Sequence, residues 1–144
     1  MVPYKKQSSE DLQSKIQYYF EKSLAMSEFD LEAMMMFARN LNEVLTSLLY
    51  IQLLGKEPYF LKTIKKTIKG ELKETKVKYL KNQHSKIREI EKKDMIPQSI
   101  LICLNMLSSL GNVSVHGSEI LDKKLNEPLR KIILFICDWF YVEY

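Results

Sequence analysis

The sequence predicts an all-α fold, a bundle of five to six helices, and three observations carry this prediction. Glycine and proline are scarce, at four each in 144 residues, which leaves little material for tight turns between strands. Apolar residues recur at intervals of three and four along most of the chain, as on one face of a helix. No segment stands out by the strict apolar–polar alternation of a half-buried strand.

The first helix is predicted by a cap. Ser8 followed by Asp11 is a capping-box pattern, which predicts a helix that runs to about Met26. Residues 1–7 are expected to form a flexible N-terminal arm, and residues 8–144 a single helical domain.

The second helix is predicted to be the longest. Ser27 with Asp30 repeats the cap pattern, and the apolar stripe continues to Leu54 before Gly55 ends it. Met34–Met36 cannot all face one core, so the run either serves a second contact in part or belongs to an ordinary wide helix face.

Residues 56–94 form a basic segment, with 13 Lys/Arg against 6 Asp/Glu, while the rest of the chain holds 9 against 12. A helix is expected over Tyr59–Lys69, ended or kinked by Gly70, and helical sequence continues to Lys93 with a break near Asn82–Ser85. Clustered lysines can neutralise phosphates, but interleaved glutamates favour a solvated helix face over a nucleic-acid footprint. The candidate nucleic-acid-binding residues are Lys62, Lys65, Lys66, Lys69 and Lys73.

A nearly all-apolar helix is expected over Gln98–Leu110, in the core or shared with a partner chain. Gly111 is predicted to end it, followed by Asn112 and, after a short connection, His116. The last helix is expected over Glu127–Val142, capped by Asn126.

These elements resemble the HEPN superfamily of helical domains, in the bacterial branch with a Gly-Asn-x-x-x-His turn. The resemblance covers roughly residues 9–142. It is carried by Gly111-Asn112 with His116, Ala38-Arg39 with Glu43, Ile96-Pro97 before the apolar helix, and Trp139-Phe140 in the last helix.

The resemblance implies a metal-independent ribonuclease site in active members, where an Arg shortly before the His neutralises the phosphate. Here the Arg positions hold Ser109, Leu110 and Gly111, and no Lys or Arg occurs between Asp94 and Lys123. Loss of a fixed cation removes the main stabiliser of the phosphorane charge, so catalysis is not expected. If the domain is active, the catalytic residues are His116, Asn112 and Arg39, with Arg39 as a relocated cation. Without such a role, Arg39 is expected to pair with Glu43 one turn on.

The function expected is therefore a non-catalytic HEPN-like interaction or regulatory domain, linked by the resemblance to a bacterial defence or toxin system and its protein partners. The alternatives are the endoribonuclease just described and an RNA-binding module that uses segment 56–94, with weak binding. No metal or cofactor is expected, because two His and two scattered Cys lack zinc-ligand spacing. The apolar helix and the resemblance predict a homodimer. The lone cysteines and the lack of a long apolar stretch predict a cytoplasmic protein without membrane contact.

Overall fold

The computed structural model describes residues 1–115 and 123–144, and of residues 110–115 and 123 it describes the backbone alone. The prediction of an all-α fold is wrong, because a two-stranded antiparallel sheet accompanies five α-helices in the described residues. The elements are α1 (Ser9–Ala25), α2 (Leu31–Leu54), β1 (Tyr59–Ile68), β2 (Glu71–Leu80), α3 (Gln83–Lys92), α4 (Gln98–Val115), a 3₁₀ turn η1 (Lys123–Leu125) and α5 (Asn126–Glu143).

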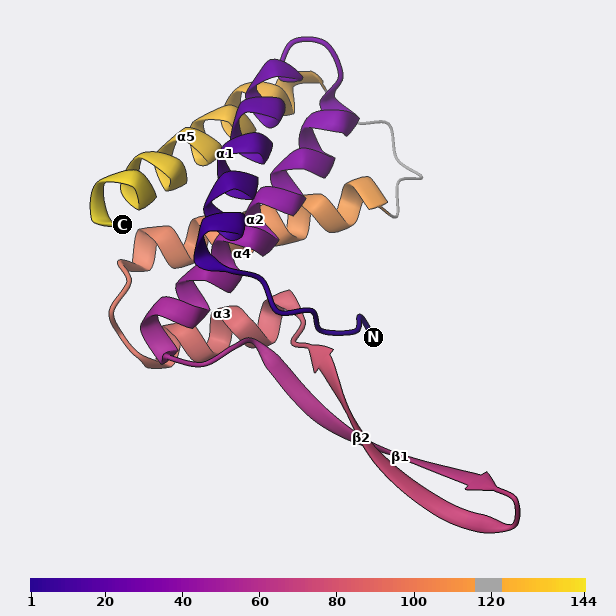
Figure 1. Cartoon of the computed structure of the whole chain (residues 1–144). Helices are drawn as coiled ribbons and strands as arrows, with labels where there is room; N and C mark the ends of the chain where they lie inside the picture. The colour runs from indigo at the N-terminus through magenta and orange to yellow at the C-terminus, as the bar shows by residue number, and fades with distance from the viewer. Residues whose placement is uncertain (116–122) are drawn as a thin grey trace.

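Helix α2 is the centre of the helical body, and it contacts each of the other four α-helices (Figure 1). Its 24 residues correspond to about 36 Å of helix. Leu41, Leu45, Leu48 and Leu49 are fully buried along it, so one wide apolar face receives side chains from several neighbours. Within the methionine run, Met34 and Met35 are buried whereas Met36 is 53% exposed.

The caps were largely predicted. The Ser8 side chain accepts a hydrogen bond from the backbone N–H of Asp11, and Gly55 ends α2 with a left-handed φ of 66°. The expected start of α2 is three residues early, because Asp30 caps the helix by accepting from Ala33 N–H. Ser27 instead donates to the carbonyl of Leu24, at the end of the preceding helix.

Helix α4 does not end at Gly111, and its backbone stays helical to Val115. Glycine permits a left-handed cap but does not impose one, and inside a helix it costs only about 1 kcal/mol relative to alanine. The last helix begins at Asn126, but its cap position is Leu125, which makes no side-chain cap bond. The Asn126 amide donates instead to the carbonyl of Ser27, tying α5 to the α1–α2 connection.

The largest correction concerns segment 59–80, expected as helix and observed as a β-hairpin that projects from the helical body (Figure 1). We call β1, β2 and their turn the ribbon. The turn consists of Lys69 and Gly70, both with positive φ (53° and 80°), as in two-residue type I′ turns whose twist matches the strands. Frequent β-branched residues, such as Thr63 and Ile64, favour extended backbone. The break between two helices predicted near Asn82–Ser85 is instead a passage from β2 into α3, which Asn82 caps and which begins at Gln83.

The N-terminal segment pairs with the base of the ribbon. Leu80 N–H donates to the carbonyl of Val2 at 2.8 Å, and Tyr4 N–H donates to the carbonyl of Lys78 at 3.2 Å. Pro3 thereby forms a bridge with Tyr79. Residues 2–4 thus act as a short third strand, which covers one strand edge where the ribbon meets the helices.

Candidate nucleic-acid interface

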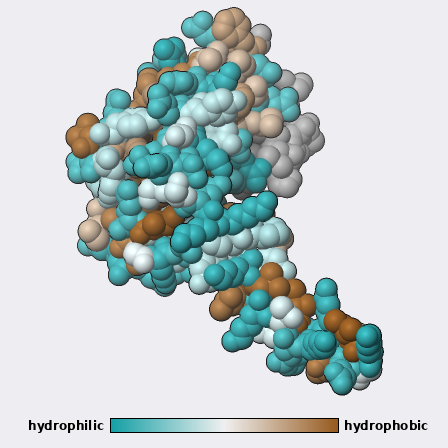
Figure 2. Space-filling model, viewed as in Figure 1, coloured by the Kyte–Doolittle hydropathy of each residue, from teal (hydrophilic) through white to brown (hydrophobic). Residues whose placement is uncertain are grey.

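The ribbon concentrates positive charge on a narrow projection. Over residues 59–80 it holds seven lysines against two glutamates, a net charge of +5. Figure 2 shows hydrophilic residues interleaved with hydrophobic ones along this projection. All five lysines proposed from the sequence for nucleic-acid binding lie on it and are exposed: Lys62, Lys65, Lys66, Lys69 and Lys73.

The strand register distributes these lysines over both faces. Residues paired across the strands share a face, so Lys62, Lys66 and Lys73 lie on one face, which also carries Ile64. The other face carries Lys65, Lys76 and Lys78, and Lys69 lies at the tip. The ribbon therefore presents cations to a ligand on either side and at its end.

One cross-strand pair brings like charges together. Lys66 lies directly opposite Lys73, an arrangement that destabilises a hairpin unless an anion lies nearby. On the other face Lys65 faces Glu74, and their charged groups are 3.5 Å apart, with both side chains more than half exposed. Such an exposed pair contributes at most about 1 kcal/mol.

Aromatic rings gather at the base of the ribbon. Phe60 and Tyr79 are cross-strand partners with ring centroids 5.9 Å apart. On the opposite face the Lys78 ammonium lies 4.6 Å from the centroid of Tyr59, whose ring is 5.2 Å from that of Tyr4. Burial, and then a hydrogen bond with Glu57, raise the pKa of Tyr4 to about 12.

The ribbon is fastened to the helices by an ion pair at its end. Lys81 Nζ lies 2.7 Å from a Glu89 carboxylate oxygen on α3, and it also donates to the Tyr50 hydroxyl on α2 at 3.0 Å. Burial lowers the pKa of Lys81, but the bonds to Glu89 and Tyr50 outweigh it and leave that pKa above its usual value. Burial raises the pKa of Glu89, but hydrogen bonds with Lys81 and Tyr50 outweigh this effect and hold that pKa below its usual value.

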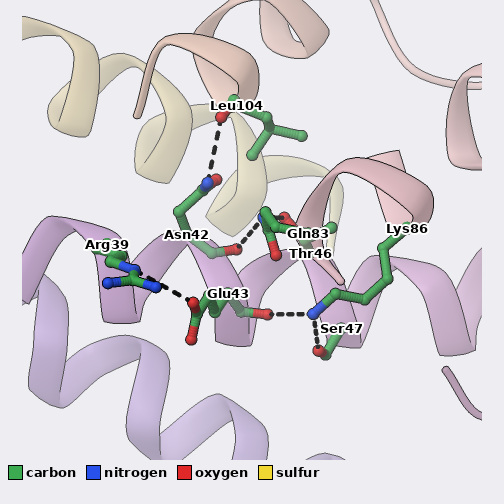
Figure 3. Close-up of polar contacts among 8 residues, drawn as sticks. All are labelled: Arg39, Asn42, Glu43, Thr46, Ser47, Gln83, Lys86 and Leu104. Carbon is green, nitrogen blue, oxygen red and sulfur yellow. Dashed lines mark hydrogen bonds and ion pairs between the residues drawn. The ribbon is translucent and has the colours of Figure 1, made fainter. Parts of the chain in front are cut away.

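A polar cluster lies between α2, α3 and α4 near this fastening point (Figure 3). Asn42 donates to the carbonyl of Leu104 at 3.1 Å, and Gln83 donates to the carbonyl of Asn42 at 3.2 Å. Lys86 is 1% exposed, and its ammonium donates to the Ser47 hydroxyl at 2.9 Å. Burial lowers the pKa of Lys86 to about 8, against a smaller opposing effect of the Glu43 carboxylate. Sequence reasoning missed Asn42, Gln83 and Lys86, which no short spacing connects.

Of the three residues proposed for catalysis, Arg39 is the one whose side chain lies in the described part of the chain. Arg39 lies on α2, where its Nε is 3.4 Å from the Glu43 carboxylate, so the predicted local ion pair is confirmed. Asn112 belongs to α4 by its backbone, but its side chain lies outside the described part of the chain. His116 lies outside the described residues altogether.

Three further predictions from the sequence concern metals, membranes and thiols. Within residues 1–115 and 123–144, no cluster of His, Cys, Asp or Glu could hold a metal ion. In the same residues no helix combines the length and apolar character needed to span a bilayer. Cys103 and Cys137 are free, and burial, with a smaller effect of Asp138, raises the pKa of Cys137 to about 12. A thiol with such a pKa is unreactive at neutral pH.

The chain was also compared with known proteins. No family model, no curated protein and no solved structure matches it, so the functional argument rests on the ribbon and the polar cluster at its base.

Proposed function

We propose that the protein binds single-stranded RNA through the ribbon and does not cleave it. The observation that carries the proposal is the net charge of +5 on an exposed two-stranded projection whose base carries aromatic side chains. Lysines neutralise backbone phosphates and release counterions, while aromatic rings give unpaired bases a surface for stacking. The unfavourable opposition of Lys66 and Lys73 supports the same ligand, because a phosphate between them offsets their repulsion.

The proposal that the protein does not cleave RNA rests mainly on the sequence. No Lys or Arg occurs between Asp94 and Lys123, and Arg39 is paired with Glu43. A lone histidine could take up a proton, but the charge that develops on phosphate would lack a fixed cation. The resemblance to HEPN domains stays a prediction, and so does the regulatory role in a defence or toxin system that it implies. An RNA-binding domain without catalysis is compatible with both.

The test is the salt dependence of RNA affinity. Fluorescence anisotropy with a labelled RNA of about 12 nucleotides should give an affinity that falls steeply as salt rises. In the double variant Lys66→Ala/Lys73→Ala, the slope of log affinity against log salt should fall by about 1.4, since each single-strand phosphate contact contributes about 0.7. The RNA should be recovered intact with EDTA present.

The matched control removes two exposed lysines from the helical body, in Lys22→Ala/Lys131→Ala. This variant has the same net charge as the ribbon variant and should keep the slope of the unaltered protein. Equal slopes for both double variants would mean that net charge, and not the ribbon, governs binding. Absence of salt-sensitive binding in the unaltered protein would refute the proposal itself.

Two finer expectations belong to the same proposal. The chain is proposed to form a homodimer, supported by exposed apolar residues on α4, and to work in the cytoplasm, supported by two free cysteines. The proposed regulatory role also includes binding to a protein partner.

A further inference from the structure

The two faces of the ribbon carry the same net charge, but their charged groups differ in what they contact. One face, which we call the open face, carries Lys62, Lys66, Lys73 and Glu71. The other, which we call the paired face, carries Lys65, Lys76, Lys78 and Glu74. Each face has three lysines and one glutamate, so the charge of a face does not decide which one an RNA follows.

On the paired face, most of the groups that could bind RNA already have a neighbour. The Lys65 ammonium lies 3.5 Å from the Glu74 carboxylate, so a phosphate that approached this lysine would also approach a negative charge. The Lys78 ammonium lies 4.6 Å from the centroid of Tyr59, and the ring of Tyr4 lies 5.2 Å from that of Tyr59. A cation and a second ring therefore lie against the aromatic side chain that a base would need for stacking.

On the open face, the lysines lack such neighbours. In the part of the chain that the structure describes, Lys62, Lys66 and Lys73 take part in no ion pair. Lys66 lies directly opposite Lys73, and Lys62 follows four residues from Lys66 on the same strand, about 13 Å away. Glu71 lies on the tip side of these lysines, opposite Ile68. The three ammonium groups thus form a row that is available to successive phosphates.

At the base of the ribbon, the open face ends in an aromatic pair and a further cation. Phe60, whose ring centroid is 5.9 Å from that of Tyr79, is 37% exposed and borders a pocket of about 290 Å³. Arg88 of α3 borders the same pocket, and its guanidinium contacts His84 at 2.7 Å. The carboxylate of Glu89, which also lines the pocket, pairs with the lysine that fastens the ribbon. Arg88 therefore offers a phosphate contact on the helical body, next to an exposed ring.

We infer that single-stranded RNA follows the open face alone, from Lys66 and Lys73 past Lys62 to the ring of Phe60, and reaches the helical body at Arg88. This inference rests on the proposed RNA binding by the ribbon, and it adds the face, the direction of the path and a binding residue outside the ribbon. The path from Lys66 to Phe60 is about 20 Å long. The ribbon is twisted, as Figure 1 shows, and a flexible single strand can follow a twisted face.

The first test compares two lysines that differ in face and in little else. Lys62 and Lys76 are both exposed and lie on neighbouring cross-strand pairs, Lys62 on the open face and Lys76 on the paired face. Fluorescence anisotropy with a labelled oligouridine of about 12 nucleotides measures the slope of log affinity against log salt. In Lys62→Ala the slope should fall by about 0.7, the contribution of one single-strand phosphate contact. In Lys76→Ala, which removes the same charge, it should stay unchanged.

The second test concerns the end of the path. Arg88→Gln should also lower the slope by about 0.7, whereas Arg130→Gln, at an exposed arginine of α5, should not. Phe60→Leu removes an aromatic surface and no charge. It should weaken binding by about 5- to 100-fold at every salt concentration, the effect of one stacked base, with an unchanged slope.

The outcomes separate this inference from the proposed function. Equal losses of slope in Lys62→Ala and Lys76→Ala would show that RNA uses both faces, which overturns the inference and leaves RNA binding by the ribbon standing. An unchanged slope in Arg88→Gln would overturn the contact with the helical body, and an unchanged affinity in Phe60→Leu the stacking. If the unaltered protein shows no salt-sensitive binding, the proposed function fails and the inference fails with it. The lysines and arginines compared are all exposed, so their replacement leaves the core intact.

Discussion

Lys86 shows what a single buried charge does to this fold. Its ammonium is almost fully removed from water, yet the bonds it donates go to neutral oxygens, the Ser47 hydroxyl at 2.9 Å and the Glu43 backbone carbonyl at 3.5 Å. Two neutral acceptors do not replace the lost hydration of a full charge. Burial accordingly lowers the pKa of Lys86 to about 8, only partly opposed by the Glu43 carboxylate.

The lowered pKa of Lys86 predicts how the free energy of unfolding changes with pH. The folded-state value of about 8 lies below the unfolded value of 10.5, so between these values the unfolded chain binds more protons. The free energy of unfolding should therefore rise with pH through this window. Lys86→Met, which removes the charge and keeps an apolar stem, should be the more stable protein at pH 7. Its advantage over the unaltered protein should shrink by roughly 2 kcal/mol at pH 10.

Urea unfolding at both pH values measures this difference, and pairing each protein with its variant cancels the titration of other groups. Lys92→Met, at an exposed lysine of the same helix, is the control and should give a difference that pH leaves unchanged. A stability gap for Lys86→Met that is the same at pH 7 and pH 10 would contradict the prediction.

At the scale of elements, the ribbon depends on its turn, because a two-stranded hairpin without a core is marginally stable. Gly70 has φ 80°, where a side chain is strained even though no atom lies within 4 Å of an added Cβ. Gly70→Ala should therefore weaken strand pairing by about 1–2 kcal/mol. Amide hydrogen exchange in β1 and β2 should speed up by roughly 5- to 30-fold, while exchange in the core of α2 stays unchanged.

A substitution at the neighbouring Lys69 should have the opposite effect on the ribbon. Lys69 has φ 53°, and asparagine tolerates this region better than lysine. Lys69→Asn should thus slow exchange in the ribbon. If Gly70→Ala instead sped up exchange throughout the helices, the ribbon would not be a separate unit of stability.

The ribbon also shows where sequence reasoning fails and where it succeeds. Phe60, Ile64 and Ile68 are spaced by four, which fits one face of a helix and one face of a strand equally well. Both ribbon faces mix lysines with apolar residues, so no hydrophobic face reveals the period of two. The caps at Ser8 and Gly55, by contrast, follow from local chemistry and were predicted.

The polar cluster between α2, α3 and α4 lay beyond sequence reasoning for a different reason. Asn42 and Gln83 are 41 residues apart and meet only because α3 packs against α2 after the ribbon has returned the chain. The ribbon had been predicted as helix, so this return could not be foreseen. The lysines could be proposed as candidates from the sequence alone, because a cluster of charged residues can be recognised without knowing the backbone conformation.

At the scale of the whole molecule, hydrophilic and hydrophobic residues both reach the surface of the helical body and of the ribbon (Figure 2). The ribbon has a net charge of +5 in a chain whose net charge is +4, whereas α4 leaves apolar side chains uncovered. Ile102 and Met106, one turn apart on α4, are 51% and 44% exposed. Removal of such a patch from water stabilises association by about 25 cal/mol for each Å² buried.

We expect this face of α4 to pair with the same face of a second copy, as a two-fold homodimer requires. Sedimentation velocity at micromolar concentration should then show a species of about twice the 17.0 kDa chain mass. Ile102→Glu/Met106→Glu should shift the protein to monomer, because carboxylates buried without partners strongly oppose association. Phe29→Glu, at an 83% exposed residue just before α2, is the control and should remain dimeric. If the unaltered protein sediments as a monomer at every concentration, the dimer is ruled out. If the double variant still forms a dimer, the interface lies elsewhere on the molecule.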